Sequence, residues 1–78
     1  MGTYNGHKNW NHWNVSLWIN NDEGLYRLAL DHARARGVPR RQAAVNFLRD
    51  IADCGGLTHT PDGAKYTISS VMGAMSGM

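Results

Sequence analysis

A chain of 78 residues with a formal net charge of +2 and a sequence pI of about 9.0 is long enough for one small domain. We therefore expect residues 1–78 to fold as a single domain. The one cysteine, Cys54, excludes an internal disulfide, which fits a reducing cytoplasm, and we expect it to be a small buried side chain. No apolar run resembles a signal peptide or is long enough to cross a bilayer, so no membrane association is expected.

The first predicted helix lies within residues 9–22, NWNHWNVSLWINND, which hold all three tryptophans of the chain. Trp10, Trp13 and Leu17 are spaced so that they line one helical face. We therefore expect Trp13 and Leu17 to be buried at the centre of the fold. Trp10 or Trp18 is expected to be partly exposed.

The asparagines of this stretch predict where helices begin and end. Asn9 or Asn11 can cap the first helix, because a short side-chain oxygen accepts a hydrogen bond from an unpaired backbone N–H. Asn20 followed by Glu23 approximates a capping box for a second helix. Asn14 lies inside the first predicted helix and has no local role. It should therefore form a specific hydrogen bond or serve the function.

The next two predicted helices meet at a short turn. The second helix is expected to run to about Arg36, with Gly37 as its C-terminal cap. Pro39 suits the first position of the third helix, because its fixed φ angle is already helical. Apolar residues at helical spacing carry this third helix to the glycine pair at residues 55–56.

A β-hairpin is predicted for residues 57–68, LTHTPDGAKYTI. Pro61, Asp62 and Gly63 supply turn chemistry, and alternate residues over 64–68 share one face. Residues 69–75 form a short terminal helix in one interpretation, which Gly73 disfavours by roughly 1 kcal/mol relative to alanine. The expected fold class is thus α+β and mainly helical, with three helices, a short C-terminal β-hairpin and an optional terminal helix.

Catalytic and metal-binding chemistry is not expected from this sequence. The histidines lie in four different predicted segments, with no second histidine at helical i+4 spacing: His7, His12, His32 and His59. Asp22 and Glu23 are adjacent, so on a helix they point to different faces and do not form an acid/base pair. No phosphate-binding loop or serine-nucleophile motif is present. We therefore expect no enzyme activity, no metal and no cofactor.

Binding surfaces are predicted from the uneven distribution of arginines and aromatic residues. Arg34, Arg36, Arg40 and Arg41 flank the predicted Gly37-Val38-Pro39 turn and should form an exposed basic corner. Arginine binds carboxylates bidentately, so this corner suits an acidic patch on a protein partner; a solvated corner is the alternative. Trp18 and Tyr26 are further candidates, because interfaces favour aromatic residues.

A DNA-binding function is the alternative interpretation. Helices followed by a hairpin are typical of a winged helix-turn-helix, and the same arginines could contact phosphates in a small phage DNA-binding or regulatory protein. Against this, the third helix offers few side chains that read bases. Direct nucleic-acid binding is therefore not expected.

Residues 4–26, YNGHKNWNHWNVSLWINNDEGLY, resemble the recurring pattern of a small family of phage- and prophage-borne proteins, Y-N-G-x-x-N-x-x-x-W-N-V-x-L-W-I-x-N-D-E-x-L-Y. The resemblance covers about the first third of the chain. The matching positions are Tyr4, Asn5, Gly6, Asn9, Trp13, Asn14, Val15, Leu17, Trp18, Ile19, Asn21, Asp22, Glu23, Leu25 and Tyr26.

At least one protein resembling this pattern is an anti-CRISPR protein that inhibits the type I-C surveillance complex. The resemblance implies a non-enzymatic inhibitor that binds a Cas7- or Cas8-type subunit of this Cascade complex and prevents target DNA from binding. It would act as a monomer in the cytoplasm of the infected bacterial host. Proteins that mimic DNA are usually strongly acidic, so the mildly basic charge favours steric blockade of a DNA-binding surface or locking of a conformation.

Overall fold

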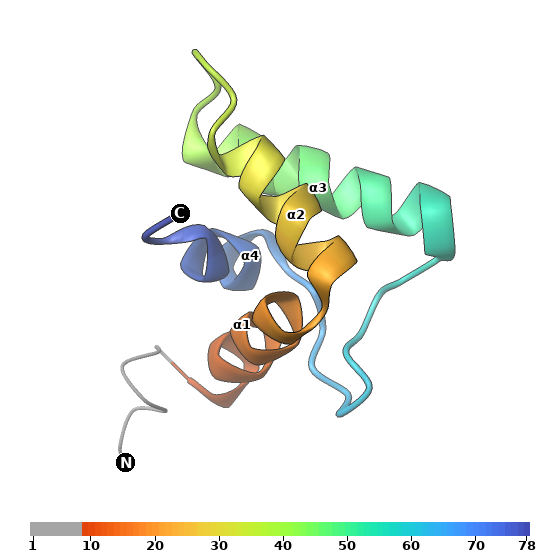
Figure 1. Ribbon diagram of the computed structural model, residues 1–78. Helices are drawn as coiled ribbons and strands as arrows, with labels where there is room; N and C mark the ends of the chain where they lie inside the picture. The colour runs from red at the N-terminus through yellow and green to blue at the C-terminus, as the bar shows by residue number, and fades with distance from the viewer. Residues whose placement is uncertain (1–8) are drawn as a thin grey trace.

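The computed structural model describes residues 9–78, which form four α-helices joined by short connections (Figure 1). They are α1 (Trp10–Asn21), α2 (Glu23–Ala33), α3 (Arg40–Gly55) and α4 (Ile68–Met75). Helix α4 packs against both α1 and α3, while α2 packs on α1 and α3. The hydrophobic core therefore lies among all four helices. None of the helices described is long and apolar enough to span a membrane.

The α+β prediction is wrong, because residues 9–78 contain no strand and only one isolated antiparallel bridge, between His59 and Lys65. The turn itself was correctly predicted: the Gly63 N–H donates to the Thr60 carbonyl oxygen at 2.9 Å, and Gly63 has a φ of +97°. The segment from residue 56 to residue 67 is a loop folded back on itself. We refer to it as the α3–α4 loop.

The two arms of this loop do not extend into strands, because the helices bind its alternating residues. Ala64 and Tyr66 are buried in the core beside the helices. The sequence alternation thus reflects burial against helices and not pairing within a sheet. A lone two-stranded hairpin is marginally stable in water, so packing of these side chains decides the conformation.

A single residue, Asp22, separates α1 from α2. Its backbone N–H donates to the Trp18 carbonyl oxygen at 3.1 Å and ends α1, while its side chain accepts from the Leu25 N–H at 3.0 Å and caps α2. The predicted Asn20–Glu23 capping box is therefore wrong. The Asn20 side chain is still within α1 and donates to the Ser16 carbonyl oxygen at 2.8 Å.

The remaining helix ends follow local capping chemistry. Asn9 caps α1 as expected, accepting from the His12 N–H at 3.0 Å. Helix α2 ends at Ala33, before the predicted end at Arg36, because the chain turns into the connection to α3. Helix α3 ends with Gly56 in the left-handed conformation at a φ of +63°.

The terminal helix α4 is present despite Gly73, because its start is strongly capped. Thr67 and Ser70 form a reciprocal capping box, with side-chain to backbone distances of 3.0 and 2.9 Å. Gly73 lies where α4 approaches α1. A Cβ atom added there would lie 3.1 Å from Nδ1 of His12. The glycine therefore permits the close approach of two helices.

The buried face of α1 differs from the predicted one. Trp13 and Leu17 are only partly buried, and the residues of α1 with fully buried side chains are instead Asn14, Val15 and Ile19. Helical spacing identifies residues that share a face, but it does not say which face meets the core. Trp10 is 38% exposed and Trp18 is half-buried, so the expectation for these two is confirmed.

Phe47 on α3 is fully buried, so it should make the largest single contribution to the core. Replacement by alanine should lower the free energy of unfolding by about 3–5 kcal/mol, because it leaves a cavity. Leu57, at 40% exposure, serves as the control, and Leu57→Ala should cost about 1 kcal/mol or less. Urea denaturation measures both values, and equal losses would contradict this description of the core.

Candidate functional site

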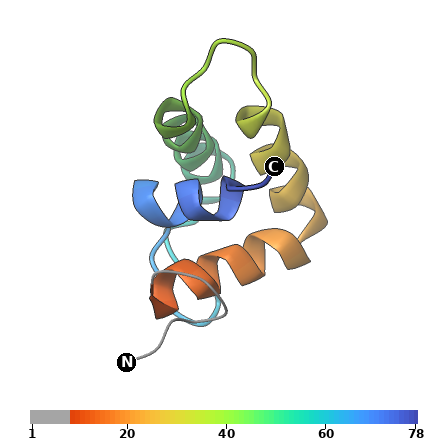
Figure 2. The same ribbon diagram turned by 90° about the vertical axis from the view of Figure 1, so that its left-hand side faces the viewer.

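The connection between α2 and α3, residues 34–39, forms a tip at one end of the molecule (Figure 2). Arg34, Arg36, Arg40 and Arg41 are all exposed on or beside this tip, and we name the four together the arginine corner. Within residues 9–78 none of them forms an ion pair with an Asp or Glu side chain. Arg34 Nε donates to the main-chain oxygen of Met78 at 3.2 Å, so the C-terminal residue meets this corner.

Helix α3 begins with two cations at the end of a helix where cations are unfavourable. Arg40 and Arg41 occupy its first turn, and Pro39 before them provides no side-chain cap. The helix dipole opposes positive charge there by about 0.3–1 kcal/mol per exposed side chain. An acidic group from another molecule would therefore compensate both the arginines and the uncapped backbone N–H groups.

The aromatic candidates lie apart from the arginine corner. Trp18 is on α1, the helix that lies at the end of the molecule opposite the α2–α3 tip (Figure 1). Tyr26 is on α2 and is 37% exposed. The structure thus brings the four arginines together, but it does not bring Trp18 and Tyr26 into the same site.

A buried polar network fixes the α3–α4 loop to α1. Asn14 is 1% exposed, and its Nδ2 donates to Oδ2 of Asp62 at 2.8 Å. The hydroxyl of Thr60 donates to Oδ1 of Asn14 and accepts from the Ala64 N–H at 3.0 Å. Trp18 Nε1 donates to the same Asp62 oxygen at 2.9 Å. The expectation that Asn14 forms a specific hydrogen bond is confirmed, and we name this set the Asn14 network.

The network and the core also shift two pKa values. Hydrogen bonds from Asn14, and next from Trp18, lower the pKa of the Asp62 carboxyl, because both stabilise the ionised form. Burial raises the pKa of the Tyr66 phenol, and the carboxylate of Asp22 adds to this effect. Asp62 is therefore a negative charge, whereas the buried Tyr66 phenol of the same loop remains neutral.

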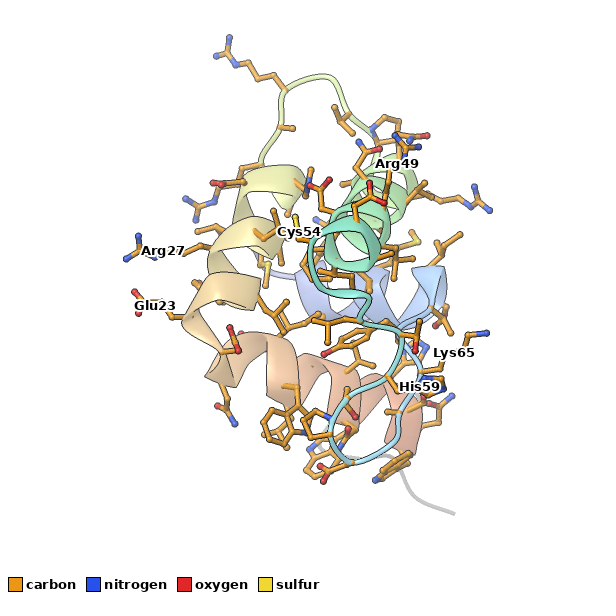
Figure 3. The ribbon with its side chains drawn as sticks, turned by 90° about the vertical axis from the view of Figure 1, so that its right-hand side faces the viewer. Glu23, Arg27, Arg49, Cys54, His59 and Lys65 are labelled. Carbon is orange, nitrogen blue, oxygen red and sulfur yellow. The ribbon has the colours of Figure 1, made fainter. Side chains whose placement is uncertain are left out.

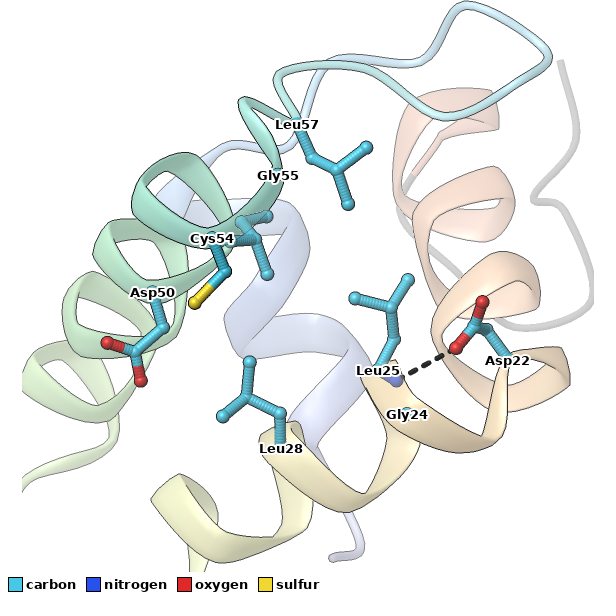
Figure 4. A pocket seen from close by; sticks show the side chains of 9 residues that line it. Asp22, Gly24, Leu25, Leu28, Asp50, Cys54, Gly55 and Leu57 are labelled. Carbon is cyan, nitrogen blue, oxygen red and sulfur yellow. Dashed lines mark hydrogen bonds between the residues drawn. The ribbon is translucent and has the colours of Figure 1, made fainter.

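Two adjoining hollows lie where α2 begins and α3 ends (Figure 4). The first has a volume of about 320 Å³ and lies between α2 and α3; the second, of about 360 Å³, lies between α1 and the α3–α4 loop. They share Asp22, Leu25 and Leu57, so we treat them as one surface, the α2–α3 groove. Trp18 lines its second hollow.

Sequence reasoning missed this groove. Cys54 was expected to be buried, but it is exposed and lines the first hollow, with its thiol facing the gap between α2 and α3 (Figure 4). Leu57 was assigned to a strand and instead lies at the lip of the groove. The only signal in the sequence was a leucine directly after two glycines, which is too weak to predict a surface.

The histidines do not gather into a metal site. Among residues 9–78 no three His, Cys, Asp or Glu side chains are grouped to hold a metal ion, and His7 lies outside the described residues. His32 Nε2 lies 2.6 Å from Oδ2 of Asp50 and joins α2 to α3. His12 Nε2 lies 3.0 Å from the hydroxyl of Ser69 and joins α1 to α4. Both described contacts tie one helix to another.

The fold and these surfaces define a small four-helix domain with a basic corner at one end and an apolar groove near the other. The whole chain, residues 1–78, matches a family of unknown function, DUF7249, and the protein belongs to that family. Comparison with curated proteins finds no match, and comparison with solved structures finds none either.

The lowered pKa of Asp62 predicts a specific pH dependence. Its stabilising contribution should be fully present above about pH 4, the ordinary range of an aspartate, and should be lost as pH falls through the lower pKa of the folded state. Asp62→Asn should therefore flatten the acid decline of the urea midpoint. Asn14→Ala should have the same effect, since it removes the main cause of the shift.

Asp53→Asn provides the control, because it changes the same charge at an exposed position outside the network. Urea midpoints measured at a series of pH values below neutral compare the four proteins. If Asp62→Asn and Asp53→Asn show identical profiles, the Asn14 network does not hold the Asp62 carboxylate in solution.

Proposed function

We propose that this protein is a non-enzymatic inhibitor of the type I-C Cascade complex that blocks target DNA binding sterically. The proposal rests first on the resemblance of residues 4–26 to the phage and prophage pattern that includes an anti-CRISPR protein. The membership in a family of unknown function is compatible with it. The partner would be a Cas7- or Cas8-type subunit.

Four of the residues that carry the resemblance have clear structural roles. Asn9 caps α1, Asn14 and Trp18 bind the α3–α4 loop, and Asp22 joins α1 to α2. The pattern therefore supports a shared fold more directly than a shared interface. The contact with a partner is better sought outside residues 4–26.

The arginine corner is the observation that best supports such a contact. It lies on a projecting tip, outside the resembling stretch, and its exposed arginines have no Asp or Glu partner within residues 9–78. A convex basic tip complements a concave acidic surface on a protein. Because its charge is opposite to that of DNA, the tip would obstruct a DNA site by its bulk and not by imitating phosphates.

Reversing two charges of the corner tests this proposal. Arg40→Glu with Arg41→Glu should leave the fold intact, since both side chains are exposed. It should weaken inhibition more than tenfold, because breaking a desolvated charge pair costs about 2–5 kcal/mol. The assay titrates the protein against purified type I-C Cascade and measures its binding to a duplex target.

The matched control makes the same charge change elsewhere. Arg49 on α3 and Lys65 in the α3–α4 loop are both exposed and lie outside the corner (Figure 3). The double replacement of these two by glutamate should inhibit like the wild type. A corner variant that folds and inhibits as well as wild type would remove the arginine corner from the interface.

The winged-helix alternative was suggested by the predicted β-hairpin, which the described residues do not form. No hairpin wing is present in residues 9–78, and the α2–α3 connection spans residues 34–39, longer than the usual three- or four-residue turn of a helix-turn-helix. Helix α3 does present Gln42, Asn46 and Arg49 outward or at its margin. The alternative is therefore worth one direct measurement.

A gel-shift series with duplex DNA provides that measurement. We expect no appreciable binding at physiological salt. A DNA-binding protein that used all four arginines of the corner should instead lose affinity with a log–log salt slope of about −3 to −4. Sub-micromolar binding with such a slope would favour the DNA-binding function over inhibition through a protein contact.

A further inference from the structure

The α2–α3 groove combines an apolar wall with acidic groups. Its aliphatic lining comes from four residues on three segments: Leu25 and Leu28 of α2, Ile51 of α3, and Leu57 of the α3–α4 loop. The ionisable residues of its two hollows are Asp22, Asp50, Cys54, His59 and Tyr66, and neither hollow is lined by a lysine or arginine. The groove is therefore apolar and acidic, whereas the arginine corner is basic.

The groove is held in shape by contacts already described. Asp22 is fixed as the residue that ends α1 and caps α2. The Leu57 N–H donates to the Ile51 carbonyl oxygen at 3.2 Å, directly after the left-handed Gly56. The Asn14 network holds the far side of the loop. A preformed groove binds a ligand without the entropic cost of ordering itself.

The two carboxylates lie on opposite sides of the apolar wall. Figure 4 shows Asp50 and Cys54 on α3 at one side of the groove and Asp22 at the start of α2 at the other, with Leu25 and Leu28 between them. Asp50 accepts one contact from His32 and keeps 42% of its side chain exposed. An occupant that satisfies both sides needs apolar side chains in the middle and positive charge at its flanks.

We propose that the α2–α3 groove binds a short amphipathic segment of a partner protein, in which large aliphatic side chains are flanked by lysine or arginine. The aliphatic side chains cover Leu28 and Leu57, and the flanking cations lie beside Asp22 and Asp50. This surface is distinct from the arginine corner and its occupancy does not depend on inhibition of Cascade. The protein thus has a second docking surface of opposite charge.

A random library of 12-residue peptides displayed on phage, selected against the full chain, tests the proposal. The selected peptides should share aliphatic residues flanked by lysine or arginine. Synthetic copies should protect Cys54 from a thiol reagent, since it is the only cysteine and lines the groove. Fluorescence anisotropy then gives the affinity of each peptide for variants of the protein.

Matched pairs of variants locate the binding surface. Asp22→Asn removes a groove charge but keeps an N-capping residue, and Asp31→Asn removes an exposed charge elsewhere. Leu57→Ser and Tyr26→Ser each remove an exposed large side chain, of 40% and 37% exposure, and only Leu57 lines the groove. The groove variants should weaken binding by at least about fivefold, and their controls should not.

Other outcomes overturn the proposal. Selection of acidic peptides, failure to select any peptide, unchanged Cys54 reactivity, or equal effects of groove and control variants would each do so. Sedimentation velocity tests a second copy as occupant, because an arginine corner seated in the groove of another chain would form head-to-tail assemblies. If the protein self-associates and Leu57→Ser abolishes this self-association, the groove binds a second copy of this protein and not a segment of a different partner.

Discussion

The hydrogen bond between the buried Asn14 amide and the Asp62 carboxylate is the interaction on which the arrangement of this fold most depends. It connects residues 48 positions apart and joins the first helix to the loop that delivers the chain to the last helix. Trp18 Nε1 and the Thr60 hydroxyl add further hydrogen bonds between this loop and α1. A buried amide tolerates few alternative partners, so the network specifies one conformation of the loop as well as stabilising it.

Most of the local chemistry was predictable, although the Asn20–Glu23 capping box was not formed, whereas the packing of one element on another was not predictable. The asparagine cap, the Pro-Asp-Gly turn and the course of the helices follow from side chains within a few residues of one another. The burial of Trp13 and the hairpin were wrong, because each required knowing which face of an element meets its neighbours. In both cases the pattern gave the correct spacing of the apolar residues. It did not show which face of the element packs against the neighbouring helices.

The two candidate surfaces also differ in how far they could be predicted from the sequence. The arginine corner was predictable because its members lie within eight consecutive positions around one turn. The groove draws its lining from α1, α2, α3 and the α3–α4 loop, so no single stretch of sequence contains its signature. One surface is basic and the other is acidic, and they lie near opposite ends of the molecule. The charge is therefore distributed unevenly, although the net charge is only +2.

Gly73 lowers the helix propensity of α4 but leaves room for a side chain of α1. Alanine usually favours a helix over glycine by about 1 kcal/mol, so consensus or helix-propensity redesign would replace this residue. Here the added methyl group would press on the His12 ring, which Ser69 already holds through the opposite nitrogen. The gain in α4 would be set against a shift of the His12 ring away from α4. The position of this ring between the first and last helices thus depends on an atom that the chain omits.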